Sequence, residues 1–111
     1  MIKSLLCTAV LLGAMVSVQA KTVLIDLRTQ PEIAATGRVE GAKAADFMSG
    51  DFMKQFKATG AQPDDEIELY CRSGHRAGLA KNQLEAMGYK NVKNLGGYEQ
   101  AAQTLHRPLV K

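Results

Sequence analysis

A short apolar run, a polar loop and a long amphipathic run follow one another in the second half of this sequence. Residues 67–70 have the composition of a buried strand, and the run that begins at Ala77 has the spacing of a helix with one apolar face. The loop between them has the sequence CRSGHR. A strand that passes through a tight loop into a helix is the repeating unit of α/β folds.

This loop places Cys71 where negative charge is stabilised. A helix N-terminus presents unpaired N–H groups that attract anions. Gly74 lets the backbone turn so that N–H groups point inward, while Arg72 and Arg76 add two cations. Such surroundings favour a thiolate, so we interpret Cys71 as a nucleophile in an anion cradle. The alternative is an inert cysteine packed in the core.

The first 20 residues have the pattern of a cleaved secretory signal peptide. Lys3 gives a positive start, residues 5–18 are almost wholly apolar, and the run ends at the small residue Ala20. The apolar run is short for a bilayer span, and no stop-transfer pattern follows it. We therefore expect cleavage before Lys21, a periplasmic location in a Gram-negative cell, and no membrane association afterwards.

Cleavage would leave 91 of the 111 residues, enough for one domain over residues 21–111. The formal net charge would fall from +3 to +2, and Cys71 would be the only cysteine, which excludes an internal disulfide. A lone thiol in an oxidising compartment is a liability unless it is buried or used. The mild charge, with no basic run and no tryptophan, argues against nucleic-acid binding. We expect a monomer.

Strand and helix patterns alternate along the rest of the chain. Thr29, Pro31 and Glu32 form the signature of a helix start, and Gly88 is typical of a helix end. We expect Asp26 and Arg28, at the end of the first strand, to form a structural ion pair or a hydrogen-bonded brace. The predicted strands are residues 22–27, near 44–45, 67–70 and 91–95, and the predicted helices are about 30–35, 51–58, 77–87 and 98–105.

The helix over residues 77–87 is the clearest of these elements. Lys81 and Glu85 are spaced to pair on its polar side, and its apolar side repeats at helical spacing through Ala77, Ala80, Leu84 and Met87. A second apolar stripe is expected to pack in the core, with a surface for an apolar ligand as the alternative; it comprises Phe47, Met48, Phe52, Met53 and Phe56. The acidic cluster of residues 64–66 is expected to be a solvated turn.

These patterns predict an α/β fold: one domain with a mostly parallel central sheet of four or five strands flanked by helices. In such sheets the ligand site lies at the carboxyl ends of the strands. Cys71 follows one of those ends, which places the candidate nucleophile at the expected site.

Several motifs, in this order along the chain, resemble those of the rhodanese domains, in particular the small exported single-domain members of the phage-shock-protein E type. They are IDLR at residues 25–28 with Glu32 following, GRVEGA at 37–42, the loop at 71–76, MGY at 87–89 and LGG at 95–97. Arg38 departs from the family, which usually has histidine there. The resemblance covers nearly all of residues 21–111 and implies a rhodanese fold.

The resemblance also implies a thiosulfate sulfurtransferase. Cys71 would attack thiosulfate, expel sulfite and hold the transferred sulfur as a persulfide until cyanide or a thiol removes it. The rest of the loop would bind the substrate anion through Arg72, Ser73, Gly74, His75 and Arg76. His75 need not act as a base, because sulfite leaves as an anion without a proton. No cofactor is implied, and two scattered histidines with one cysteine give no metal-ligand spacing.

Two other functions remain open. Cysteine-dependent phosphatases place five residues between their cysteine and arginine, whereas four separate Cys71 from Arg76 here, which suits a smaller group. A sulfur carrier or binding module that delivers persulfide sulfur to a partner protein would need the same loop. Slow turnover with small acceptors would indicate this second function.

Overall fold

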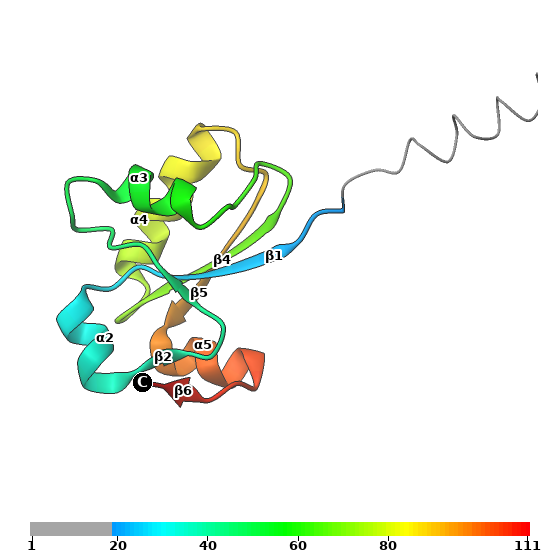
Figure 1. The fold of residues 1–111 in the computed structure, drawn as a ribbon. Helices are drawn as coiled ribbons and strands as arrows, with labels where there is room; N and C mark the ends of the chain where they lie inside the picture. Colours follow the sequence, from blue (N-terminus) through cyan, green and yellow to red (C-terminus); the bar gives the residue numbers. More distant parts are fainter. Residues whose placement is uncertain (1–18) are drawn as a thin grey trace, which may run out of the picture.

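Four parallel strands form the central sheet, in the order β3-β1-β4-β5 (Figure 1). They are β1 (Thr22–Asp26), β3 (Lys43–Ala44), β4 (Glu66–Cys71) and β5 (Asn91–Gly97). The computed structural model describes residues 19–111, so most of the predicted signal peptide, residues 1–18, lies outside it. The observed sheet confirms the expected parallel α/β architecture.

Four helices cover the two faces of the sheet. They are α2 (Gln30–Thr36), α3 (Phe52–Ala58), α4 (His75–Ala86) and α5 (Tyr98–Leu105). Figure 1 shows α3 and α4 on one face, and α2 and α5 on the other. Within residues 19–111, no helix is both long enough and apolar enough to cross a membrane.

Side chains of the two central strands alternate between two apolar cores, as the period of two in a strand requires. Ile25, Leu69 and Cys71 belong to the core beneath α3 and α4, whereas Leu24 and Tyr70 belong to the core beneath α5. Both central strands are therefore buried on both faces, as is usual for a parallel sheet. The alternation fixes the side of the sheet from which Cys71 projects.

A second, two-stranded sheet was not predicted from the sequence. It pairs β2 (Arg38–Val39) with β6 (Leu109–Val110) in antiparallel orientation. Gly37 has a φ of 82°, and a Cβ there would lie 2.8 Å from the Val110 carbonyl oxygen, so only glycine fits this approach. The Val39 N–H donates to the Tyr70 hydroxyl at 2.9 Å, which ties this small sheet to the strand that carries Cys71.

Two expectations about apolar residues were wrong. Met48 and Met87 were assigned to buried helix faces, but their exposed fractions are 69% and 48%. Met48 precedes α3, and Met87 is the cap residue that follows the last residue of α4. The other members of both stripes are buried or partly buried, and the predicted Lys81–Glu85 ion pair is present at 3.3 Å.

Asp65 corrects the expectation of a solvated acidic turn, because it is only 3% exposed. Its carboxylate accepts hydrogen bonds from Lys21 Nζ at 2.7 Å, from the Lys21 backbone N–H at 3.0 Å and from the Gln62 N–H at 2.8 Å. These donors, the Lys21 side chain foremost, lower the pKa of Asp65 to about 2. The first residue of the predicted mature chain is therefore fixed to the fold at both its backbone and its side chain.

Candidate active site

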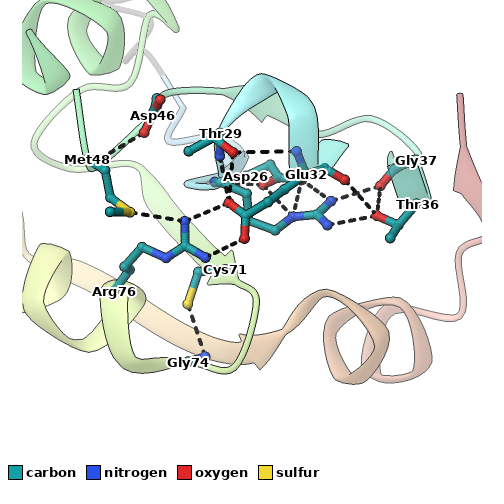
Figure 2. Close-up of polar contacts among 11 residues, drawn as sticks. Asp26, Thr29, Glu32, Thr36, Gly37, Asp46, Met48, Cys71, Gly74 and Arg76 are labelled. Carbon is teal, nitrogen blue, oxygen red and sulfur yellow. Dashed lines mark hydrogen bonds and ion pairs between the residues drawn. The ribbon is translucent and has the colours of Figure 1, made fainter. Parts of the chain in front are cut away.

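Cys71 ends β4, and three loop residues separate it from α4. The predicted order of strand, loop and helix is confirmed, but the helix begins at His75, two residues earlier than predicted. Gly74 caps α4 with a φ of 96°, a conformation that favours glycine. Its N–H donates to Cys71 Sγ at 3.0 Å (Figure 2). The thiol is 1% exposed, and this one donor shows that the loop backbone turns towards the sulfur.

The end of β5 packs against the back of this loop. Gly97 lies so close that a Cβ there would be 2.6 Å from the Arg72 carbonyl oxygen, and a Cβ on Gly74 would be 3.2 Å from the Gly96 Cα. Asn94 donates from Nδ2 to the Gly74 carbonyl oxygen at 3.0 Å and accepts the Gly96 N–H at 2.8 Å. The glycine pair and Asn94 thus fix the position of Gly74, whose N–H reaches the sulfur.

Arg76 projects from the first turn of α4 to Glu32 in α2. Its Nη1 and Nη2 donate to the two Glu32 carboxylate oxygens, each at 2.8 Å, and Nη1 also lies 3.7 Å from Met48 Sδ (Figure 2). Arg76 therefore stands at the loop with its charge already balanced by a carboxylate. The sequence analysis singled out both residues but did not predict that they pair.

Glu32 also forms part of the predicted helix start, as the partner of Thr29 at the N-terminus of α2. It accepts hydrogen bonds from the Thr29 N–H at 2.9 Å and the Thr29 hydroxyl at 3.0 Å, and the Thr29 oxygen in turn accepts the Glu32 N–H. The Arg76 guanidinium first, and then the Thr29 donors, lower the pKa of Glu32 from 4.5 to about 2. The ion pair between α2 and the loop therefore persists at all but strongly acidic pH.

The Glu32→Gln variant should reveal this ion pair through the pH dependence of stability. A lowered carboxyl pKa stabilises the folded state fully above pH 4.5, and this contribution is lost as the pH falls towards 2. The gap in unfolding free energy between wild type and variant should be constant above about pH 5 and shrink between pH 4.5 and pH 2. Urea unfolding at each pH measures it, and a gap that does not change with pH would contradict the assignment.

Arg72, Ser73 and His75 are exposed at the loop surface. The described ion pairs engage Arg28 and Arg76 but not Arg72, so the Arg72 charge is available to a ligand. His75 begins α4. The structure thus brings all six predicted site residues to one end of the sheet, although Arg76 faces Glu32.

Asp26 and Arg28 form the expected ion pair, and it is fully buried. Arg28 Nη2 lies 2.8 Å from Asp26 Oδ2, and the two side chains are 1% and 0% exposed. Arg28 also donates to Thr36 Oγ1 and to the Gly37 carbonyl oxygen, both at 2.8 Å. This brace joins the end of β1 to the end of α2, and so holds the helix that carries Glu32.

The arrangement can support nucleophilic chemistry by Cys71 on an anionic substrate. A sulfur beside a helix N-terminus can hold negative charge, because a fixed N–H already points at it. Among residues 19–111 no group of three or more His, Cys, Asp or Glu side chains could hold a metal ion.

Comparisons with known proteins agree with the motifs in the sequence. A sequence model described as the rhodanese-like domain matches residues 10–104. Thiosulfate sulfurtransferase 18 of Arabidopsis thaliana is 34% identical over 96 residues, which cover 71% of this chain and 69% of that protein. Thiosulfate sulfurtransferase PspE of Escherichia coli is 43% identical over 44 residues, or 38% of this chain and 42% of that protein.

A solved structure described as a rhodanese with anions from E. coli superposes with a TM-score of 0.65 at 33% identity. The alignment covers 81% of this chain and 98% of that one. The structural similarity therefore extends over about four fifths of this chain and nearly the whole of the other.

Proposed function

Because the chain belongs to the family of rhodanese-like domains, we propose that it is a thiosulfate sulfurtransferase that works through a persulfide on Cys71. The observation that carries the proposal is the position of the Cys71 sulfur, which accepts the Gly74 N–H at the start of α4. A nucleophile that must hold negative charge both before and after it receives sulfur needs such fixed donors.

In the proposed donor step, the Cys71 thiolate attacks the outer sulfur of thiosulfate. A bond forms between Sγ and that sulfur, the sulfur–sulfur bond of thiosulfate breaks, and its electron pair leaves with sulfite. In the second step an acceptor attacks the outer persulfide sulfur and Cys71 leaves as thiolate. Neither step requires a proton from His75 or a change in oxidation state of a metal.

The donor step is tested by the mass of the protein after mixing with thiosulfate. We expect one sulfur atom to be added and cyanide to remove it. Thiosulfate should load the protein faster than 3-mercaptopyruvate, because its two charges lie close to the transferred sulfur. No added mass with either donor would overturn the proposal, and faster loading by mercaptopyruvate would overturn the choice of donor.

Arg72 is the cation we assign to the incoming donor, since it is exposed and outside the described ion pairs. Losing one charged hydrogen bond costs about 1.5–3 kcal/mol, so Arg72→Ala should lower kcat/KM for thiosulfate by about ten- to a hundredfold. Arg76→Ala is the comparison variant, because it removes a cation whose charge Glu32 already balances. Its loss of kcat/KM for thiosulfate should be smaller than that of Arg72→Ala. Equal activity of Arg72→Ala and wild type would contradict the assignment.

A sulfur carrier that delivers persulfide sulfur to a partner protein would use the same loop but would differ in its kinetics. A protein that only delivers sulfur to a partner should load at a normal rate but discharge slowly to cyanide and small thiols. Measuring the two half-reactions separately therefore distinguishes an enzyme from a carrier.

A further inference from the structure

We propose that Met48 is a site of oxidation to methionine sulfoxide, and that the sulfoxide oxygen accepts a hydrogen bond from Arg76 beside the Cys71 loop. The inference goes beyond the proposed function, because it requires only an exposed thioether next to this arginine. Its consequence is that oxidation weakens the positive charge at the loop that carries Cys71.

Met48 is exposed although its backbone is held in place. It is 69% exposed, the largest value among the exposed large apolar residues that the structure describes. The Met48 N–H donates to Asp46 Oδ1 at 2.8 Å, and the Ser49 hydroxyl donates to the Asp46 carbonyl oxygen at 2.9 Å. Asp46 is in turn held by α3, because its N–H donates to Gln55 Oε1 at 2.8 Å. This turn therefore presents the thioether to solvent at a fixed position.

The sulfur of Met48 faces the guanidinium of Arg76 and lies 3.7 Å from Nη1 (Figure 2). Nη1 carries two hydrogens, and Glu32 Oε1 accepts one of them at 2.8 Å. The contact with Met48 involves the other hydrogen, and a thioether is only a weak acceptor. Arg76 therefore has one N–H next to Met48 that is open to a stronger acceptor.

Met48 and Arg76 lie on the side of the sheet from which Cys71 projects. Cys71 belongs to the core beneath α3 and α4, and Phe47, the neighbour of Met48, packs against the same core. Hydrogen bonding to Glu32 first, and then the charges of Glu32 and Cys71, raise the pKa of Arg76 against the opposing effect of burial. The Arg76 charge therefore acts on the sulfur of Cys71.

The oxidant we assign to this step is a peroxide, with hydrogen peroxide as the simplest member. The Met48 sulfur attacks one peroxide oxygen, a sulfur–oxygen bond forms and the oxygen–oxygen bond breaks. The second oxygen leaves as water with both peroxide hydrogens. Sulfur is oxidised by two electrons, and the peroxide is reduced by two. A methionine sulfoxide reductase restores the thioether.

The sulfoxide differs from the thioether in its polarity. Its oxygen carries partial negative charge and is attached to a sulfur that already lies beside Arg76 Nη1. It is therefore positioned to accept the Nη1 hydrogen that Glu32 leaves open. This places the negative end of a dipole against the cation, so that less positive charge acts on Cys71.

The first measurement asks which methionines hydrogen peroxide oxidises. Cys71→Ser is the starting protein, so that the thiol does not consume the oxidant, and peptide masses report the oxygen added at each residue. We expect Met48 and Met87, which is 48% exposed, to be oxidised at least about five times faster than Met53, which packs against the core. Oxidation of Met48 no faster than that of Met53 would overturn the site.

The second measurement asks whether the new oxygen reaches Arg76. Met87 is the matched control, because it is exposed but lies about 16 Å further along α4. After oxidation, the nitrogen-15 NMR signals of the Arg76 side chain should shift in Cys71→Ser/Met87→Leu and stay unchanged in Cys71→Ser/Met48→Leu. Loss of these signals in Arg76→Ala assigns them. Unshifted signals in the variant that keeps Met48 would overturn the hydrogen bond.

The third measurement asks whether an oxygen at this position weakens the cation beside Cys71. Met48→Gln supplies a neutral carbonyl oxygen without oxidant, and Met48→Leu is the control of similar size. For each variant, the rate at which iodoacetate alkylates Cys71 is divided by the rate for neutral iodoacetamide, which cancels the intrinsic reactivity of the thiol. The ratio should be about two- to tenfold lower in Met48→Gln than in Met48→Leu.

A double-variant cycle shows whether this effect acts through Arg76. When Arg76→Ala is added to both Met48 variants, their two alkylation ratios should become equal. Equal ratios while Arg76 is still present would overturn the effect of Met48 on the site. Thermal unfolding checks that each variant is folded.

The outcomes separate this inference from the proposed function. The first two measurements use protein without the Cys71 thiol, and the third requires no sulfur transfer. If thiosulfate never loads Cys71 but Met48 is oxidised and shifts the Arg76 signals, the proposed function fails and the oxidation site stands. If thiosulfate loads Cys71 and Met48 resists oxidation, the function stands and this inference fails.

Discussion

Replacement of Cys71 by serine is expected to reduce sulfur transfer to the uncatalysed background while the domain stays folded. A hydroxyl is close in size to the thiol and can accept the Gly74 N–H that now donates to Sγ at 3.0 Å. It cannot form a persulfide, so neither half-reaction is possible. The cost to stability should be about 1–2 kcal/mol, because the position is 1% exposed and the new hydroxyl is more polar.

Thiosulfate:cyanide activity and circular dichroism measured on the same preparation check this expectation. Cys71→Ala is the companion variant, since it removes the sulfur without adding a polar group. Substantial activity in either variant would show that Cys71 is not the nucleophile. Loss of the folded spectrum in serine but not in alanine would show that burial of the hydroxyl, and not the chemistry, dominates the serine variant.

Asp26→Asn is expected to have the largest effect on stability. The variant leaves Arg28 charged at a position that is 1% exposed, and breaking a buried ion pair in this way costs about 3–5 kcal/mol. Whole domains are stable by only about 5–15 kcal/mol, so a large part of the stability would be lost. The hydrogen bonds from Arg28 to Thr36 and Gly37 remain, which favours the lower end of the range.

Urea unfolding with an unchanged m-value measures this loss. The double variant Asp26→Asn/Arg28→Met is the control, because it also removes the charge that the single variant leaves unpaired. The double variant should be more stable than Asp26→Asn alone. If Asp26→Asn lowers the free energy of unfolding by less than about 1 kcal/mol, Arg28 does not depend on Asp26 for its burial.

The strands and helices could be predicted because their signals are local. Each of the four strands in the central sheet and each of the four described helices overlaps a predicted range, with ends shifted by at most two residues. The pairing of β2 with β6 was missed, because each strand has two residues and their pairing joins segments about 70 residues apart. A run of two residues carries no readable period.

In the candidate site, too, the features with local sequence signals were predicted and the contacts between distant residues were not. The loop, its cysteine and the buried Asp26–Arg28 brace follow from residue types close together in the sequence. The partner of Arg76 does not, because Glu32 lies 44 residues away and its position was fully explained by the helix start. One signal was available: both residues follow neighbouring strands of a parallel sheet, whose carboxyl ends meet at one edge. Asn94 gave no signal, since an exposed asparagine before two glycines is typical of many turns.

The hydrogen bonds from Lys21 to Asp65 bear on removal of the predicted signal peptide. If the precursor is cut before Lys21, the backbone nitrogen 3.0 Å from Asp65 Oδ1 changes from a neutral amide donor to a terminal ammonium. The carboxylate that faces it is buried and, with a pKa of about 2, already ionised. Cleavage would then create an ion pair between the new N-terminus and Asp65 that the uncut chain cannot form. Removal of the signal peptide would therefore also strengthen the contact that holds the start of β1 to the rest of the domain.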